Sequence, residues 1–116
     1  MLKLEKLPIE YHGQTYELAC NMEALEALQD EYDGDLNAIN QDRDIRVGFN
    51  LFRILLNLAR AEKGEEAVTE KQIKKEYNWA MLRDMDILGM LTRSTNPDAA
   101  HEKIAADAAN EEAAKN

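Results

Sequence analysis

Cysteine and histidine are scarce in this chain of 116 residues. Cys20 is the single cysteine, and His12 and His101 are the two histidines. One cysteine excludes a disulfide framework and favours a reducing compartment. No Cys or His pair has the spacing of a zinc site, and neither histidine is placed to activate the thiol. Cys20 is therefore expected to be a small core residue.

Long apolar runs and glycine-rich loops are also missing. No segment approaches the roughly 18 apolar residues of a membrane span, and the first ten residues lack the apolar run of a signal peptide. The five glycines are scattered, so no phosphate-binding loop is predicted. These absences predict a soluble cytoplasmic protein that is not an enzyme and carries no cofactor.

One segment has a faint likeness to a calcium-binding loop. Residues 33–42 read DGDLNAINQD, but Ile39 stands where an oxygen ligand belongs and the central glycine and terminal glutamate are lacking. Its acids and amides are more simply interpreted as helix caps and turn residues. We therefore expect no metal site.

Basic residues are the minority, since 14 lysines and arginines oppose 23 acidic residues and give a formal net charge of −9. An acidic protein of this size repels nucleic acid phosphates and anionic lipids, so neither is an expected partner. A helix-turn-helix interpretation of residues 68–82 would place Lys71, Lys74 and Lys75 on the recognition helix. The same helix carries Glu70 and Glu76, and the net charge argues against it.

Residues 7–18 alternate between apolar and polar side chains, as β-strands do. His12 and Gly13 suit a two-residue turn, with Gly supplying a positive φ. Pro8 lacks an N–H, which predicts an edge strand. A lone hairpin is marginal in water, so helices or another chain must cover its apolar face. The turn fixes the pairs that share this face: Leu7 with Leu18, Ile9 with Tyr16 and Tyr11 with Gln14.

The rest of the chain has helical periodicity. A helix over residues 22–32 begins at Asn21 as N-cap and ends at Gly34, and a short turn carries Leu36 and Ile39. A capping box at residues 69–72 opens another helix, and residues 79–93 are helical as well. The predicted fold class is α+β, mostly α, with an N-terminal β-hairpin followed by four to five helices.

The helix predicted over residues 44–63 is apolar around most of its circumference, which is typical of a central helix covered on several sides. Its two apolar stripes are Ile45, Phe49, Phe52, Leu55, Leu56 and Ala59, and on the other side Val47, Leu51, Ile54 and Leu58. A polar strip between them contains Arg46, Asn50, Arg53, Asn57 and Arg60. A solvated face with salt bridges to the acidic surroundings is the favoured interpretation of these arginines, and a partner site is the alternative.

Composition changes after Ser94. Residues 1–93 are predicted to form a single domain of hairpin and helices. Residues 94–116 are an acidic, Ala-rich tail in which Ile104 is the only large apolar residue. With so little to bury, this tail is expected to be a frayed helix or a disordered segment.

The apolar helices exceed what a small chain readily hides, and surplus apolar surface usually ends in an interface. Methionines adapt to irregular partners, although ordinary core filling is the alternative. A second copy of the chain is one such partner, which would make a homo-oligomer. The predicted partner-binding residues are Leu51, Ile54, Leu58, Met81, Met85 and Met90.

Three short patterns resemble one known family. Gly13, Tyr16 and Leu18 form a G-x-x-Y-x-L pattern around the hairpin. A first helix ends near Tyr32 and Gly34, a long apolar helix follows, and "T-x-x-Q-I" at residues 69–73 opens the next. From residue 7 to about residue 93, the chain resembles the small tail assembly chaperones of long-tailed bacteriophages.

The resemblance implies a non-enzymatic role in the cytoplasm of a host cell. Such chaperones keep the long tape measure protein soluble and are thought to recruit tail tube subunits around it, so these two proteins are the implied partners. The family has no sharp signature from which binding residues could be transferred. The alternative hypothesis is a small acidic inhibitor, a DNA mimic that acts on a host nucleic-acid enzyme. Acids at phosphate-like spacing are not found outside the tail, which argues against the mimic.

Overall fold

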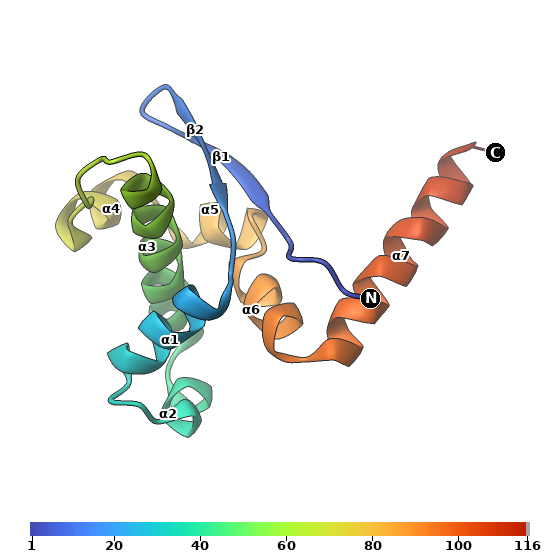
Figure 1. Cartoon of the computed structure of the whole chain (residues 1–116), viewed down its shortest axis with the longest axis horizontal. Coiled ribbons are helices and arrows are strands. Elements are labelled where there is room, and N and C mark those ends of the chain that lie inside the picture. The colour runs from blue at the N-terminus through green and yellow to red at the C-terminus, as the bar shows by residue number, and fades with distance from the viewer. Residues whose placement is uncertain (116) are drawn as a thin grey trace.

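A two-stranded hairpin and a series of helices make up the computed structural model, which describes residues 1–115 (Figure 1). The hairpin consists of β1 (Leu7–Tyr11) and β2 (Gln14–Leu18). The fold is α+β and mostly α, as predicted. The helices of the described residues are α1 (Met22–Glu31), α2 (Leu36–Gln41), α3 (Asp44–Glu62), α4 (Glu70–Glu76), α5 (Trp79–Asp84), α6 (Ile87–Thr95) and α7 (Pro97–Lys115).

The hairpin has the predicted register. Leu7 pairs with Leu18, and Ile9 pairs with Tyr16. The turn residues His12 and Gly13 both have positive φ, 49° and 80°, as a two-residue turn that matches the strand twist requires. Tyr16 and Leu18 are buried, so helices cover the apolar face of the hairpin.

Helix α3 is the centre of the fold, with β2, α1, α5 and α6 packed around it (Figure 1). Both predicted stripes contribute to the core: Leu51 belongs to one, Phe52 and Leu56 belong to the other, and each is 0% exposed. The prediction of a central helix covered on several sides is confirmed. The N-terminal end of α3 is less covered by other elements, as the 60% exposure of Ile45 shows.

Most helix ends follow the predicted caps. Asn21 Oδ1 accepts a hydrogen bond from Ala24 N at 3.0 Å, and Thr69 Oγ1 accepts one from Gln72 N at 3.2 Å. The Gln72 side chain donates to the Tyr11 hydroxyl at 3.4 Å, so it ties α4 to the hairpin. The end of α1 differs from the prediction.

Helix α1 is capped by Tyr32, and Asp33 is already left-handed at φ 55°, so Gly34 is the second residue beyond the cap and not the first. Both residues adopt positive φ, and Gly34 N donates to Gln29 O at 2.9 Å. The αL conformation at Asp33 is accessible because aspartate tolerates it better than most side chains. The glycine therefore helps to close the helix without being the first turn residue.

The predicted helix over residues 79–93 is divided into α5 and α6. Asp86 lies between them at φ 58°, ψ 45°, the left-handed region, and this turns the chain. Its carboxylate forms an ion pair with Arg93 at 2.8 Å, and Arg93 also pairs with Glu5 at 2.8 Å. These contacts hold the pKa of Arg93 above its usual value, chiefly through the hydrogen bond to Glu5. Arg93 therefore connects the residue at the break to the N-terminal segment.

Of the two forms expected for the tail, the structure contains the helix. Asn96 Oδ1 accepts a hydrogen bond from Asp98 N at 2.9 Å and so caps α7. Every residue of α7 from His101 to Glu112 is exposed, and the helix projects away from the rest of the molecule (Figure 1). In the part of the chain that the structure describes, no helix is both long enough and apolar enough to cross a bilayer.

Candidate functional site

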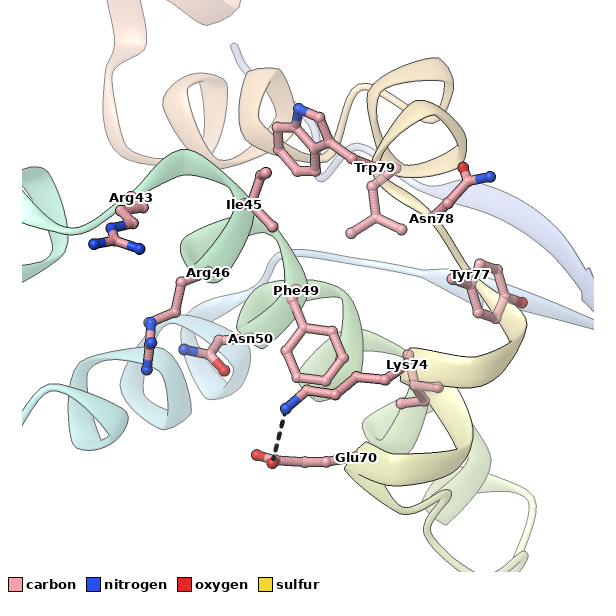
Figure 2. A pocket seen from close by; sticks show the side chains of 12 residues that line it. Arg43, Ile45, Arg46, Phe49, Asn50, Glu70, Lys74, Tyr77, Asn78 and Trp79 are labelled. Atoms are coloured by element: carbon pink, nitrogen blue, oxygen red, sulfur yellow. Dashed lines mark ion pairs between the residues drawn. The ribbon is translucent and has the colours of Figure 1, made fainter.

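A groove of about 470 Å³ lies between the N-terminal half of α3 and the segment that contains α4 and the start of α5 (Figure 2). This volume is within the range of ligand pockets in proteins. Ile45 and Phe49 line the α3 side, and Tyr77 and Trp79 line the other side. The groove therefore combines aliphatic and aromatic surface from two separate parts of the chain.

Two features allow Trp79 to contact α3: the N-cap of α5 and a glycine on α3. Asn78 caps α5 by accepting a hydrogen bond from Met81 N at 2.9 Å, which starts the helix at Trp79. On α3, Gly48 leaves room for the indole, since a Cβ there would lie 2.6 Å from Trp79 Cζ3. The close approach of a ring to backbone is a common reason for glycine in a helix. Gly48 thus sets the position of the groove wall.

Tyr77 anchors the same wall as Trp79. Its ring packs against Phe52 of the core, with centroids 4.6 Å apart and planes tilted by 54°, a favourable aromatic arrangement. Burial, together with the nearby Glu76 carboxylate, raises the pKa of the Tyr77 hydroxyl. The connection from α4 to α5 is therefore fastened to the core at the base of the groove.

The rim of the groove carries more positive than negative charge. Arg43 and Arg46 lie at the start of α3, and Lys74 on α4 faces them, whereas Glu70 is the one carboxylate of the lining. Lys74 Nζ lies 5.2 Å from the centre of the Phe49 ring and 4.0 Å from Glu70 Oε2. A cation over an aromatic face is attracted by the ring electrons. The groove is thus apolar inside and cationic at its edge.

The cysteine and the two histidines singled out in the sequence lie outside the groove. Cys20 is 3% exposed in the core, as predicted, and burial raises the pKa of its thiol. His12, at the hairpin tip, hydrogen-bonds to Glu76. Among the described residues, no group of three or more His, Cys, Asp or Glu side chains is arranged to hold a metal ion.

Half of the predicted partner-binding residues must be corrected. Leu51, Ile54 and Met90 are 0%, 6% and 1% exposed, because the hairpin and the surrounding helices cover the stripe of α3 and the inner face of α6. Their apolar area is already used in the core. They are not part of an accessible surface.

The other three predicted contact residues keep some exposure. Leu58 and Met85 are half-buried, and Met81 is 39% exposed. None of the six lines the groove between α3 and α5. Leu58 instead borders a separate hollow beside Leu4 and Ala59. The predicted patch is therefore not one continuous site.

The arginine strip of α3 is mostly internal. Arg53 forms ion pairs with Glu31 and, at 3.6 Å, with Glu70, and Arg60 pairs with Glu65 at 3.1 Å. The Arg53 and Arg60 side chains are only 15% and 18% exposed. The predicted salt bridges to acidic neighbours are confirmed for both, but the predicted solvated face is wrong at these two positions, because both side chains are largely buried.

Arg46 is the exception, since its side chain is 68% exposed at the groove rim.

The groove was not predicted from the sequence. The sequence feature that could have indicated the groove is Trp79, the only tryptophan, which directly follows a good N-cap and lies outside the obvious core pattern.

Comparison with known proteins yields no relative: no family model matches the chain, and neither a curated protein nor a solved structure does. The geometry of the molecule and the residue patterns of its sequence are therefore the basis for a functional proposal.

Proposed function

We propose that the chain is a non-enzymatic assembly chaperone that binds apolar helices of a larger partner. Its partners are of the kind implied by the resemblance to phage tail assembly chaperones. It would hold a tape measure protein soluble and help to recruit tail tube subunits in the cytoplasm of the host cell. The observation that carries the proposal is the exposed apolar groove between α3 and α5.

The groove has the properties that bind an amphipathic helix. Such a helix lays one apolar face into a hydrophobic groove and inserts bulky side chains one or two turns apart. Phe49, Tyr77 and Trp79 provide aromatic surface, and Ile45 is 60% exposed beside them. Exposed apolar surface grouped in this way is typical of an interaction site.

The remaining surface suits a carrier. The net charge of −9 keeps a small protein dispersed and would help to keep a bound apolar helix in solution. Tape measure proteins are long helical chains, so a carrier needs apolar recesses and no reactive centre. The groove and the acidic exterior together support this role.

Co-expression with a helical fragment of a tape measure protein tests the proposal. We expect the wild-type chain to raise the soluble yield of the fragment several-fold and to be recovered with it in an affinity pull-down. Ile45→Asp should abolish both effects, because a carboxylate would be placed at the apolar groove. The substitution is tolerable for the fold because the side chain is exposed and an acid suits the first turn of a helix.

Leu36→Asp is the matched control. Leu36 is also 60% exposed, and it also lies in the first turn of a helix, but it is outside the groove. This variant should behave as the wild type. The proposal fails if the wild-type chain does not solubilise the fragment, or if the two aspartate variants lose binding equally.

A further inference from the structure

We infer that the groove selects a partner helix whose apolar anchor residues are flanked by acidic side chains. This inference rests on the proposed function and adds the chemistry of the partner. It is carried by the charge of the groove rim, which is opposite to the charge of the molecule as a whole. Three cationic side chains and one carboxylate line a groove on a chain of net charge −9.

The rim cations are available to a partner. The Arg46 side chain is 68% exposed and the Lys74 side chain is 64% exposed. Arg43 is exposed, and within the described residues no carboxylate forms an ion pair with it. Charged groups that are only loosely paired on a free surface can form stronger contacts when a partner excludes water.

The nearby carboxylates offset only part of this charge. Asp42 Oδ1 lies 3.8 Å from Arg46 Nε, and the Asp42 oxygens also accept hydrogen bonds from the Tyr32 hydroxyl at 2.6 Å and from Arg43 N at 2.8 Å. These bonds, led by that from Tyr32, hold the pKa of Asp42 below its ordinary value, so this carboxylate stays ionised and offsets one positive charge. Glu70 is shared between Lys74 and Arg53. Among the side chains that line the groove, the three cations still outnumber the single carboxylate.

The face beside the groove extends the same charge. Lys71 and Lys75 lie with Lys74 along α4 and border a shallow hollow next to the groove. Helix α4 thus presents three exposed lysines and two exposed glutamates, a small positive excess on a molecule that is acidic as a whole. A helix seated in the groove would place one flank against α4 and the other against Arg43 and Arg46.

Local charge decides this contact. Screening reduces interactions between exposed charges to a range of about 8 Å at physiological ionic strength. The distant acids of the chain therefore contribute little once a helix is in place, whereas the rim cations lie directly beside it. Acidic flanks would be attracted, and basic flanks would be repelled.

Trp79 provides the readout, because it is the only tryptophan of the chain and it lines the groove. The test uses two tryptophan-free helical peptides with the same leucines on one face, flanked by glutamates in one and by lysines in the other. We expect the glutamate peptide to give a saturable blue shift of tryptophan emission. The lysine peptide should bind at least 10-fold more weakly.

Charge reversal at the rim makes the test specific. The double variant Arg43→Glu/Lys74→Glu should lose the preference for the glutamate peptide or invert it. Lys3→Glu/Lys6→Glu carries the same change in net charge at the N-terminal segment, outside the groove, and should keep the wild-type preference. Circular dichroism spectra that match the wild type establish that each variant is folded.

Each other result overturns the inference. Equal binding of both peptides would leave helix binding intact and remove only the charge selectivity. No binding of either peptide would show that the groove is not the helix site. A single-stranded oligonucleotide that binds more tightly than both peptides would assign the cationic rim to nucleic acid. A dimer of the chain that is dissociated by the glutamate peptide would assign the groove to a second copy.

Discussion

At the scale of single residues, the contact of Trp79 with Gly48 controls the shape of the groove. The indole lies so close to α3 that a Cβ at position 48 would be 2.6 Å from Trp79 Cζ3. Glycine lowers the intrinsic stability of a helix by up to about 1 kcal/mol relative to alanine. At position 48 the lower helix propensity of glycine is offset by the close approach of α3 and Trp79, which are far apart in the sequence.

Gly48→Ala should lower the free energy of unfolding by about 1 to 2 kcal/mol. Overpacking a close contact costs about 1 to 3 kcal/mol, and the better helix propensity of alanine returns part of it. Urea denaturation measures the loss, and altered tryptophan emission of the native state reports the displaced ring. In a Trp79→Ala background, where the clash is absent, the same substitution should be neutral or stabilising. An equal loss in both backgrounds would contradict this account.

A second residue-scale feature is Glu76, which receives hydrogen bonds from two residues of the hairpin tip. The Tyr11 hydroxyl donates to it at 2.9 Å, and the His12 ring is bonded to its other oxygen. These bonds, with that from His12 as the largest cause, hold the pKa of Glu76 below its ordinary value of 4.5. Burial and the same Glu76 contact raise the pKa of Tyr11 to about 12. The tip is thus fastened to the end of α4.

The lowered pKa makes the stability of the chain dependent on pH in the acid range. The ionised Glu76 stabilises the folded state above pH 4.5, and this contribution is lost as pH falls from 4.5 through the lowered folded-state value. Glu76→Gln should therefore flatten the decrease of unfolding free energy below pH 5. Tyr11→Phe, which removes one of the two hydrogen bonds, should give an intermediate slope. Parallel acid profiles of the wild type and Glu76→Gln would contradict the prediction.

At the scale of elements, the end of the loop after α3 is attached to that helix by the side chain of Asn57. Asn57 Nδ2 donates to Val68 O at 3.1 Å, and Asn57 Oδ1 accepts from Val68 N at 2.8 Å. Val68 is buried, so both of its backbone groups depend on this asparagine. The pair of bonds sets where α4 begins and, through α4, the position of Lys74 at the groove rim.

Asn57→Ala should destabilise the chain by about 1 to 3 kcal/mol, since it leaves a buried donor and acceptor unsatisfied. Hydrogen exchange of the Val68 amide should accelerate more than that of amides in α1. Asn50→Ala is the comparison. Asn50 also lies on α3, but its side chain donates only one long hydrogen bond, of 3.4 Å, to the Tyr32 hydroxyl. Its effect should be below about 0.5 kcal/mol. Similar losses for the two variants would show that Asn57 has no special role.

Elements with strong local signals were predictable from the sequence. The alternation around His12 and Gly13 predicted the strand register, and the two apolar stripes predicted the central position of α3. The division at Asp86 was not predictable, because the left-handed turn occurs at a residue with no glycine or proline beside it. The ion pair of Arg93 with Asp86 spans seven residues, but that of Arg93 with Glu5 joins residues 88 apart, and such a long-range contact has no local signal.

The groove was not predictable for a related reason. Periodicity shows which apolar residues share one face of a helix, but it does not show which of two apolar faces the neighbouring helices will cover. Leu51 and Ile54 were expected at a partner surface and are core residues, whereas Ile45 and Phe49 of the other stripe line the groove. The difference arises from the direction of the chain after α4, which the Asn78 cap and the tertiary contact of Trp79 with Gly48 determine.

At the scale of the whole molecule, the core and α7 are nearly independent. The buried cluster draws on the hairpin and on most of the helices from α1 to α6, and none of its members belongs to α7. Ile104 of α7 is 54% exposed and borders a hollow beside Leu2 and Leu4. Helix α7 therefore adds length to the molecule and little to the packing that stabilises it.

Removing residues 97–116 should change the free energy of unfolding by less than about 1 kcal/mol, because exposed residues rarely contribute more. Far-ultraviolet circular dichroism should lose the helical signal of α7, while the thermal transition stays cooperative. Ile104→Gln in the full chain isolates the contact with the N-terminal segment and should be nearly neutral. A loss above about 2 kcal/mol on truncation would show that α7 supports the core.

The projecting helix also affects how large the molecule will look in solution. The radius of gyration is 15.1 Å, and the principal extents are 46, 37 and 26 Å, whereas a compact chain of this length has a radius of about 13 Å. A single copy will therefore leave a size-exclusion column earlier than a spherical standard of 13.2 kDa. An elution volume calibrated with such standards would overstate the mass and imitate self-association. Light scattering or sedimentation equilibrium, which do not depend on shape, gives the true number of copies.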